Sequence, residues 1–157
     1  MCTLLLVGCS SRYKGIDDLM TYSIPDGYKA ENNVIHHEDR LVSIHYGKKD
    51  TSIYFIMMSY NGKAVMGSNE TIKDWLLTQE NTLKEYDVKG HKMYIYYPVA
   101  FSKGESDKKD MIEGILDYDG YMIMIGMTNN QSDNLTDEEI KEYYEVLKSI
   151  RFGEKMF

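Results

Sequence analysis

The sequence has few cysteines and few prolines, and it lacks a long apolar segment. Its 157 residues include two cysteines, Cys2 and Cys9, and two prolines. The chain after Cys9 can therefore form no internal disulfide and carries no thiol that could be oxidised. No apolar run reaches the roughly 18 to 20 residues that a membrane-spanning helix requires. With two prolines and 12 glycines there is little material for flexible linkers, so we expect a single domain.

Positive charge is also scarce. The chain has 18 Lys and Arg against 25 Asp and Glu, a formal net charge of −7. Nucleic acids and anionic lipid headgroups attract cationic surfaces, so we expect no nucleic-acid partner. Hydrophobic residues make up 43% of the chain and charged residues 27%, which is typical of a globular domain and argues against disorder.

The N-terminal residues indicate export and anchoring. The segment Leu6–Cys9 is preceded by further leucines and followed by two serines. It resembles the lipobox of bacterial lipoproteins, in which an aliphatic residue and two smaller residues precede a cysteine. The resemblance implies a partial signal peptide over residues 1–8, a lipid-modified Cys9, and a tether over residues 9–19 that holds the chain to the extracytoplasmic face of the cell membrane. The alternative is a buried strand that happens to contain cysteine.

One feature of a signal peptide is missing. Signal peptides begin with a basic region, but no Lys or Arg precedes Arg12. We therefore expect that Met1 is an internal methionine and that the start codon lies upstream.

From residue 20 to residue 157 the pattern favours one domain built mainly of strands. Turn signals separate short apolar or alternating segments, and Asp119-Gly120 is the strongest of them, because Asp-Gly favours a two-residue hairpin. This hairpin would pair Tyr118 with Tyr121 and Leu116 with Ile123. We expect a mostly antiparallel sheet of about six or seven strands. The other predicted turns are Pro25–Gly27, Asp39-Arg40, Asn61-Gly62 and Lys89-Gly90.

Two segments are expected to be helical. Apolar residues recur at helical spacing between Ser68 and Leu83. A second helix is predicted to begin at Thr136, which forms a capping box with Glu139, and to bury the face Ile140, Tyr143, Tyr144 and Leu147. The predicted strands 52–60 and 121–127 are apolar on both sides, which indicates a sheet covered on both faces.

This order of elements resembles the PsbP-like fold family, which is named after an extrinsic protein of photosystem II and includes many small bacterial lipoproteins. The resemblance rests on the opening segment 22–28, the closing segment 147–152 and a hairpin before the last helix. It implies an α+β fold, an α/β/α sandwich around an antiparallel sheet. Members of this family mostly bind or assist other proteins and are not enzymes. No functional residue of the family can be matched to a position here.

The sequence contains little that points to catalysis. It has no Gly-x-Ser-x-Gly, no phosphate-binding loop and no zinc-binding spacing of Cys or His. If Asp39-Arg40 is a two-residue turn, His36 faces Ser43 and Glu38 faces Leu41, so that His36, Glu38 and His45 share one face of a hairpin. These three could hold zinc, but nothing fixes their side chains for a metal, and we expect a solvated sheet face instead. We expect no cofactor, no bound metal and no enzymatic activity.

The 14 tyrosines are the most unusual feature of the composition. Tyr94 and Tyr96 alternate with Met93 and Ile95, so one set faces the core and the other faces away. An exposed tyrosine can anchor a protein partner or stack on a sugar ring, although tyrosine is also common in sheets by propensity. The expected function is therefore the binding of a protein or cell-envelope component. The alternatives are a tyrosine-lined module for glycans or small ligands, and a metal protein or enzyme that uses the His36 face.

Overall fold

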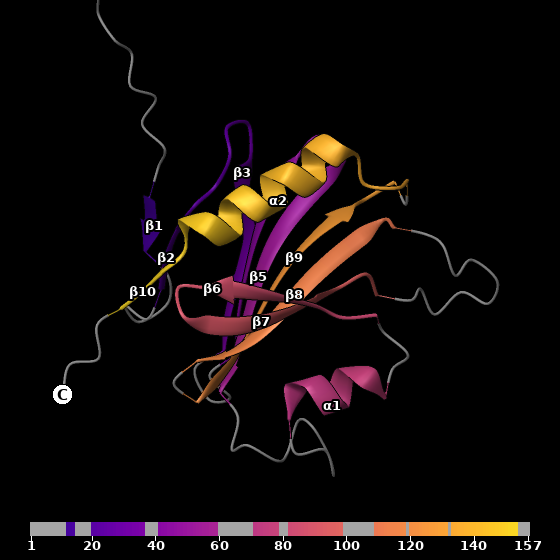
Figure 1. The fold of residues 1–157 in the computed structure, drawn as a ribbon. Coiled ribbons are helices and arrows are strands. Elements are labelled where there is room, and N and C mark those ends of the chain that lie inside the picture. Colours follow the sequence, from indigo (N-terminus) through magenta and orange to yellow (C-terminus); the bar gives the residue numbers. More distant parts are fainter. Residues whose placement is uncertain are drawn as a thin grey trace, which may run out of the picture.

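The computed structural model describes residues 12–14, 20–36, 41–59, 71–78, 82–98, 109–118, 120–131 and 133–153. Within these ranges the chain forms two sheets and two helices (Figure 1). The elements in chain order are β1 (Arg12–Lys14), β2 (Met20–Ser23), β3 (Lys29–His36), β4 (Leu41–Lys48), β5 (Thr51–Ser59), α1 (Ile72–Leu77), β6 (Lys84–Val88), β7 (His91–Tyr96), β8 (Met111–Tyr118), β9 (Tyr121–Asn129), α2 (Asp137–Ser149) and β10 (Arg151–Phe152).

The larger sheet has seven strands in the order β3-β4-β5-β9-β8-β7-β6, and every adjacent pair is antiparallel. The predicted antiparallel sheet is therefore confirmed. In the β8–β9 hairpin, Tyr118 pairs with Tyr121 and Leu116 with Ile123, as the Asp-Gly turn predicts. The turn between β6 and β7 also lies where predicted, with Gly90 at φ +86. The predicted turn at Asn61-Gly62 lies outside the described residues.

The predicted register of the β3–β4 hairpin is wrong. His36 pairs with Leu41 rather than with Ser43, and Ser43 pairs with Val34. A two-residue hairpin turn requires backbone conformations that glycine and asparagine adopt easily, and Asp39-Arg40 supplies neither. The connection between the strands therefore takes four residues instead of two.

A smaller sheet joins the two ends of the described chain. The central strand β2 pairs with β1 on one side and with β10 on the other (Figure 1). Met20 and Tyr22 of β2 are buried in the main core. The strands β1 and β10, at the two ends of the described chain, are therefore held together through their shared partner β2.

The predicted C-terminal helix is confirmed as α2. The Thr136 hydroxyl accepts the Glu139 N–H while the Glu139 carboxylate accepts the Thr136 N–H, which completes the capping box. Tyr143 and Leu147 are buried as expected. Val146 is also buried, although the sequence did not single it out.

The second helix, α1, is shorter than predicted. It covers Ile72–Leu77 and ends at Thr78, whereas the spacing of apolar residues predicts a helix between Ser68 and Leu83. Ile72 and Leu76 are buried in a small cluster with Tyr96, Ile115 and Met122. The sheet therefore has a helix on each face, but α1 is only six residues long. The fold is richer in sheet than the α/β/α sandwich that we expected. Neither described helix is long and apolar enough to cross a membrane.

Candidate binding site

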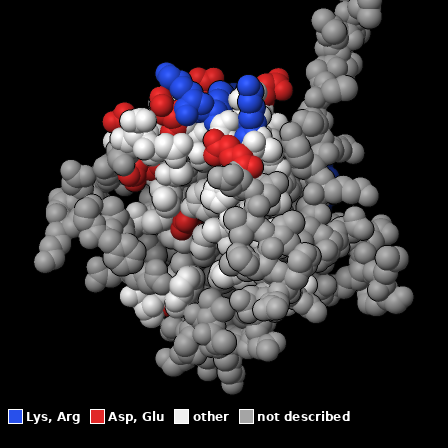
Figure 2. Space-filling view, turned by 180° about the vertical axis from the view of Figure 1, so that it is seen from behind, with Lys and Arg blue, Asp and Glu red and all other residues white. Residues whose placement is uncertain are grey.

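The two faces of the seven-stranded sheet differ sharply in burial. The face toward α2 is closed, because ten of its residues on the four strands β5, β9, β8 and β7 are at most 3% exposed (Ile53, Phe55, Met57, Met93, Ile95, Ile112, Leu116, Ile123, Ile125 and Met127). The opposite face, which we call the open face, is covered in part by α1, which packs over Tyr96, Ile115 and Met122. It retains several half-buried side chains (Ser43, His45, Ile56, Met58, Tyr94, Glu113 and Met124). Figure 2 shows the molecule from behind the view of Figure 1, and the Lys, Arg, Asp and Glu of the described surface gather mainly at its upper margin.

A row of paired residues crosses the open face. The register places His45 opposite Tyr54, Tyr54 opposite Gly126, Gly126 opposite Glu113, and Glu113 opposite Tyr96. The hydroxyl groups of Tyr54 and Tyr96 donate to the two different oxygens of the Glu113 carboxylate, and the Tyr96 bond is 2.5 Å long. The His45 ring stacks on the Tyr54 ring with 5.8 Å between centroids. We call these five residues the polar row.

An apolar row lies beside the polar row. Tyr94 pairs with Ile115, Ile115 with Met124, and Met124 with Ile56. Residues two positions apart on one strand lie about 7 Å from each other, so the two rows are in lateral contact range. We call Tyr94, Ile115, Met124 and Ile56 the apolar row. Except for Ile115, its members are half-buried.

Gly126 makes the polar row possible. A Cβ built on Gly126 would overlap the Tyr54 ring. The absence of a side chain lets Tyr54 lie flat across β9 and reach Glu113 on β8. A glycine inside a strand often marks such a close approach, and this signal could have drawn attention to Gly126 in the sequence, although not to the residues that pack against it.

The surroundings of the polar row keep its two tyrosines protonated. Burial raises the pKa of Tyr54, and the neighbouring Glu113 carboxylate raises it further. The pKa of Tyr96 is raised by the same two causes in the same order. Both hydroxyl groups therefore stay protonated and act as donors to Glu113. A catalytic tyrosine acting as base or nucleophile needs the opposite shift.

The structure keeps two of the three candidate zinc ligands, His36 and His45, apart in the sheet. His36 pairs with Leu41, which lies four positions along β4 from His45, a backbone separation of about 13 Å. Glu38 lies outside the described residues. The Nε2 atom of His45 is instead 2.8 Å from the Ser43 hydroxyl. Among the side chains that the structure describes, no group of three metal-binding residues comes together.

Tyr94 and Tyr96 both point to the open face. Tyr96 is only 6% exposed, because it packs against α1 and donates a hydrogen bond to Glu113. It therefore lacks the exposed surface that a binding residue needs. Tyr94 is half-buried. Sequence reasoning thus selected two members of the polar row, His45 and Tyr96, and missed Tyr54, Glu113 and Gly126 that connect them.

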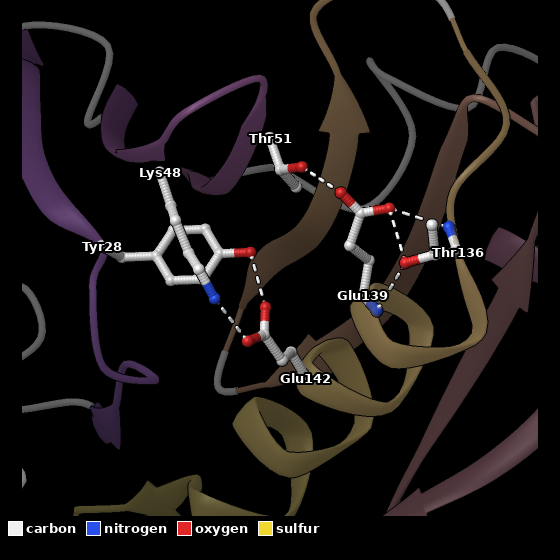
Figure 3. A network of polar contacts seen from close by, with 6 residues as sticks. All are labelled: Tyr28, Lys48, Thr51, Thr136, Glu139 and Glu142. Carbon is white, nitrogen blue, oxygen red and sulfur yellow. Dashed lines mark hydrogen bonds and ion pairs between the residues drawn. The ribbon is translucent and has the colours of Figure 1, made fainter.

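A second polar network lies on the other side of the sheet, at the first turns of α2 (Figure 3). Glu142 accepts the Tyr28 hydroxyl at 2.9 Å and the Lys48 ammonium at 2.7 Å. Lys48 Nζ also lies 5.2 Å from the centre of the Tyr28 ring. Burial first, and then Glu142, raise the pKa of Tyr28, so its hydroxyl remains a donor.

Glu139 extends this network by one turn of the helix. It accepts the Thr51 hydroxyl with one carboxylate oxygen and takes part in the capping box with the other. Burial raises its pKa, but the hydrogen bonds from Thr51 and Thr136 outweigh burial, and the pKa lies below its ordinary value. These contacts attach α2 to the β4–β5 turn, so we regard this network as structural.

The described hollows are shallow. One, of about 330 Å³, lies between the turn after β2 and the C-terminal half of α2, next to Asp26 and Ser149. Another, of about 190 Å³, lies over β6, next to Tyr86 and Lys92. Neither touches the polar row. Cys9 lies outside the described residues, as do residues 9–11 and 15–19 of the predicted tether, whereas residues 12–14 of that segment form β1 and pair with β2.

Comparison with known proteins identifies the fold. No family model matches the chain, and no curated protein matches its sequence. The solution structure of cyanobacterial PsbP (CyanoP) from Synechocystis sp. PCC 6803 is similar, with a TM-score of 0.62 and 13% identity over 97% of this chain and 98% of that one. A crystal structure from Bacteroides thetaiotaomicron VPI-5482 is similar over 92% of this chain, but over 48% of that one, with a TM-score of 0.55 and 10% identity. These likenesses concern the fold alone, and they show that this chain has a PsbP-like fold.

Proposed function

We propose that this chain is a lipid-anchored protein of the extracytoplasmic membrane face, and that its non-catalytic domain binds a protein partner through the open face of the sheet. The observation that carries the binding proposal is the half-buried apolar row beside the polar row. On the α2 side, equivalent positions are buried almost completely. Met124 packs against the cluster below α1 on one side, but Ile56 and Met124 are both half-buried and keep apolar surface that a partner could cover.

The composition of the open face supports a protein as the partner. Tyrosine and methionine are enriched in the central parts of protein interfaces, where charged residues are depleted. Sugar binding by stacking would need an exposed aromatic ring face. The rings of Tyr54 and Tyr96 are buried at 7% and 6% exposure, which makes the glycan alternative less favourable.

The anchoring part of the proposal rests on the segment Leu6–Cys9. A diacylglyceryl group on Cys9 supplies two acyl chains, and two chains hold a protein stably on a bilayer. The strand β1 begins at Arg12 and is attached to the domain through β2. In this arrangement the domain would be held close to the membrane surface by a short tether.

The binding proposal is tested by matched substitutions on the two sides of the sheet. Ile56 on the open face and Ile140 on α2 are both half-buried isoleucines. Ile56→Lys and Ile140→Lys make the same chemical change at similar starting burial. After purification from native membranes, proteins recovered with each variant are quantified by mass spectrometry, and circular dichroism confirms that the variants fold. We expect a partner that is lost with Ile56→Lys and retained with Ile140→Lys. Equal recovery with both variants contradicts the proposal.

A further inference from the structure

Within the described part of the chain, Glu113 is a carboxylate without a counter-charge. It is half-buried in the middle of the sheet, and among the described residues no Lys, Arg or His nitrogen forms an ion pair with it. The half-buried Glu142, by contrast, is paired with Lys48. The hydroxyl groups of Tyr54 and Tyr96 stabilise the Glu113 carboxylate as neutral donors, but they bring no positive charge. A charge withdrawn from water is normally compensated by an opposite charge.

The Glu113 carboxylate retains the capacity to accept more hydrogen bonds. An ionised carboxylate offers about four acceptor positions, and the two tyrosines occupy one on each oxygen. A cation that carries N–H groups could therefore add a charge-assisted hydrogen bond to either oxygen without displacing a tyrosine.

The surroundings of Glu113 indicate the shape of this cation. The apolar row crosses the sheet directly beside the polar row, and Met124 and Tyr94 in it pack against the cluster below α1 but remain half-buried. A lysine side chain carries its ammonium group on an apolar stem that commonly packs along apolar surface. A lysine could therefore pair its ammonium group with the Glu113 carboxylate of the polar row while its apolar stem packs on Met124 of the apolar row. The net charge of −7 also favours a cationic partner.

We propose that Glu113 receives the ammonium group of a lysine side chain of the protein partner, with the stem of that lysine lying across the apolar row at Met124. This inference rests on the proposed function and names the chemistry of its contact. It also explains why two tyrosine hydroxyl groups converge on Glu113, because they hold the carboxylate in place for the incoming cation.

The test uses short peptides as probes and methionine methyl groups as reporters. The protein, labelled with carbon-13 in its methionine methyl groups, is titrated with acetyl-Gly-Lys-Gly-amide and with acetyl-Gly-norleucine-Gly-amide, which has the same stem without the ammonium. The signal of Met124 reports on the open face, and that of Met93, buried on the α2 side, is the reference. We expect Met124 to shift while Met93 does not, with binding of the lysine peptide about tenfold tighter than that of the norleucine peptide.

A pair of variants with equal change in charge locates the contact. Glu113→Gln removes the charge but keeps an oxygen acceptor for the tyrosines. Glu85→Gln is the control, because Glu85 pairs with Tyr94 in register on the same side of the sheet but already forms ion pairs with Lys73 and Lys92. We expect the tenfold preference for lysine to vanish in Glu113→Gln and to persist in Glu85→Gln. If Glu113→Gln does not fold, the ratio of the dissociation constants of the two peptides for the unmodified protein decides whether the ammonium group contributes to binding.

Equal affinity for the two peptides would overturn this inference, and so would an equal loss of the lysine preference in Glu113→Gln and Glu85→Gln. Tighter binding of free 1,5-diaminopentane than of the lysine peptide would also overturn it, because it would point to a small amine as the ligand. The experiments distinguish a wrong role of Glu113 from a wrong proposal that the open face binds a protein. If the peptides do not discriminate but Ile56→Lys still abolishes recovery of the partner, the role of Glu113 is wrong and the open face remains the binding surface.

Discussion

The Tyr54 ring lies over Gly126, at the place where any other residue would carry its Cβ. These residues are paired across β5 and β9, and the missing side chain lets the Tyr54 hydroxyl reach Glu113 on the next strand. The central feature of the open face thus depends on one glycine in the middle of a strand.

The first prediction concerns this glycine. Gly126→Ala forces Tyr54 to move and breaks its bond to Glu113, so we expect a loss of about 2 to 4 kcal/mol in the free energy of unfolding. In a Tyr54→Ala background the same substitution should cost less than about 1 kcal/mol, because the ring that it displaces is absent. Urea unfolding of the four proteins in this cycle measures the coupling. Equal costs of Gly126→Ala in both backgrounds would show that the ring does not impose the glycine.

The second prediction separates the tyrosines that bind Glu113 from their neighbour. Tyr54→Phe and Tyr96→Phe each remove one hydroxyl group from the carboxylate, and each should lower the free energy of unfolding by about 1 to 3 kcal/mol. The control is Tyr94→Phe, because Tyr94 is half-buried on the same face and makes no hydrogen bond through its side chain to the residues that the structure describes. It should stay within about 0.5 kcal/mol of the unmodified protein. A Tyr94→Phe cost as large as the other two would contradict the assignment.

The third prediction is a pH dependence of stability at Glu139. Its pKa in the folded protein lies below the ordinary value of 4.5. A group with a lowered folded pKa stabilises the protein fully above its unfolded pKa, and this contribution is lost as the pH falls through the folded pKa. Glu139→Gln should therefore flatten the decline in stability below about pH 5, measured by urea unfolding at a series of pH values. Glu138→Gln, its exposed neighbour on α2, is the control and should leave the decline unchanged.

The fourth prediction concerns anchoring. Mass spectrometry of the protein extracted from membranes should find a diacylglyceryl modification on Cys9, and Cys9→Ser should release the protein into the soluble fraction. Cys2→Ser makes the same change at the other cysteine and should leave anchoring intact, because Cys2 lies in the part expected to be removed. Recovery of a membrane-bound chain with an unmodified Cys9 would refute the lipobox interpretation.

The sequence predicted those parts of the fold that depend on local chemistry. Asp119-Gly120 set the register of the β8–β9 hairpin, and Thr136 with Glu139 set the start of α2. Both signals act within a few residues. Asp39-Arg40 lacks such a signal, and the predicted register of β3 and β4 was wrong there.

The polar row could not be predicted in the same way. It depends on the pairing of β5 with β9 and of β7 with β8, and these strands are far apart in the chain or joined by long connections. Neither periodicity nor turn chemistry specifies which distant strands become neighbours. His45 and Tyr96 therefore appeared as candidates for unrelated sites, although the structure places them at the two ends of one row.

The most direct test of binding through the open face is cross-linking in native membranes from a single position on each side of the sheet. A photoreactive amino acid replaces Met124 on the open face or Lys141, an exposed residue of α2. We predict a defined cross-linked protein from position 124 that is absent from position 141, and that disappears when Ile56→Lys is introduced in the same chain. A cross-linked partner from position 141 alone, or equally from both positions, would contradict binding through the open face.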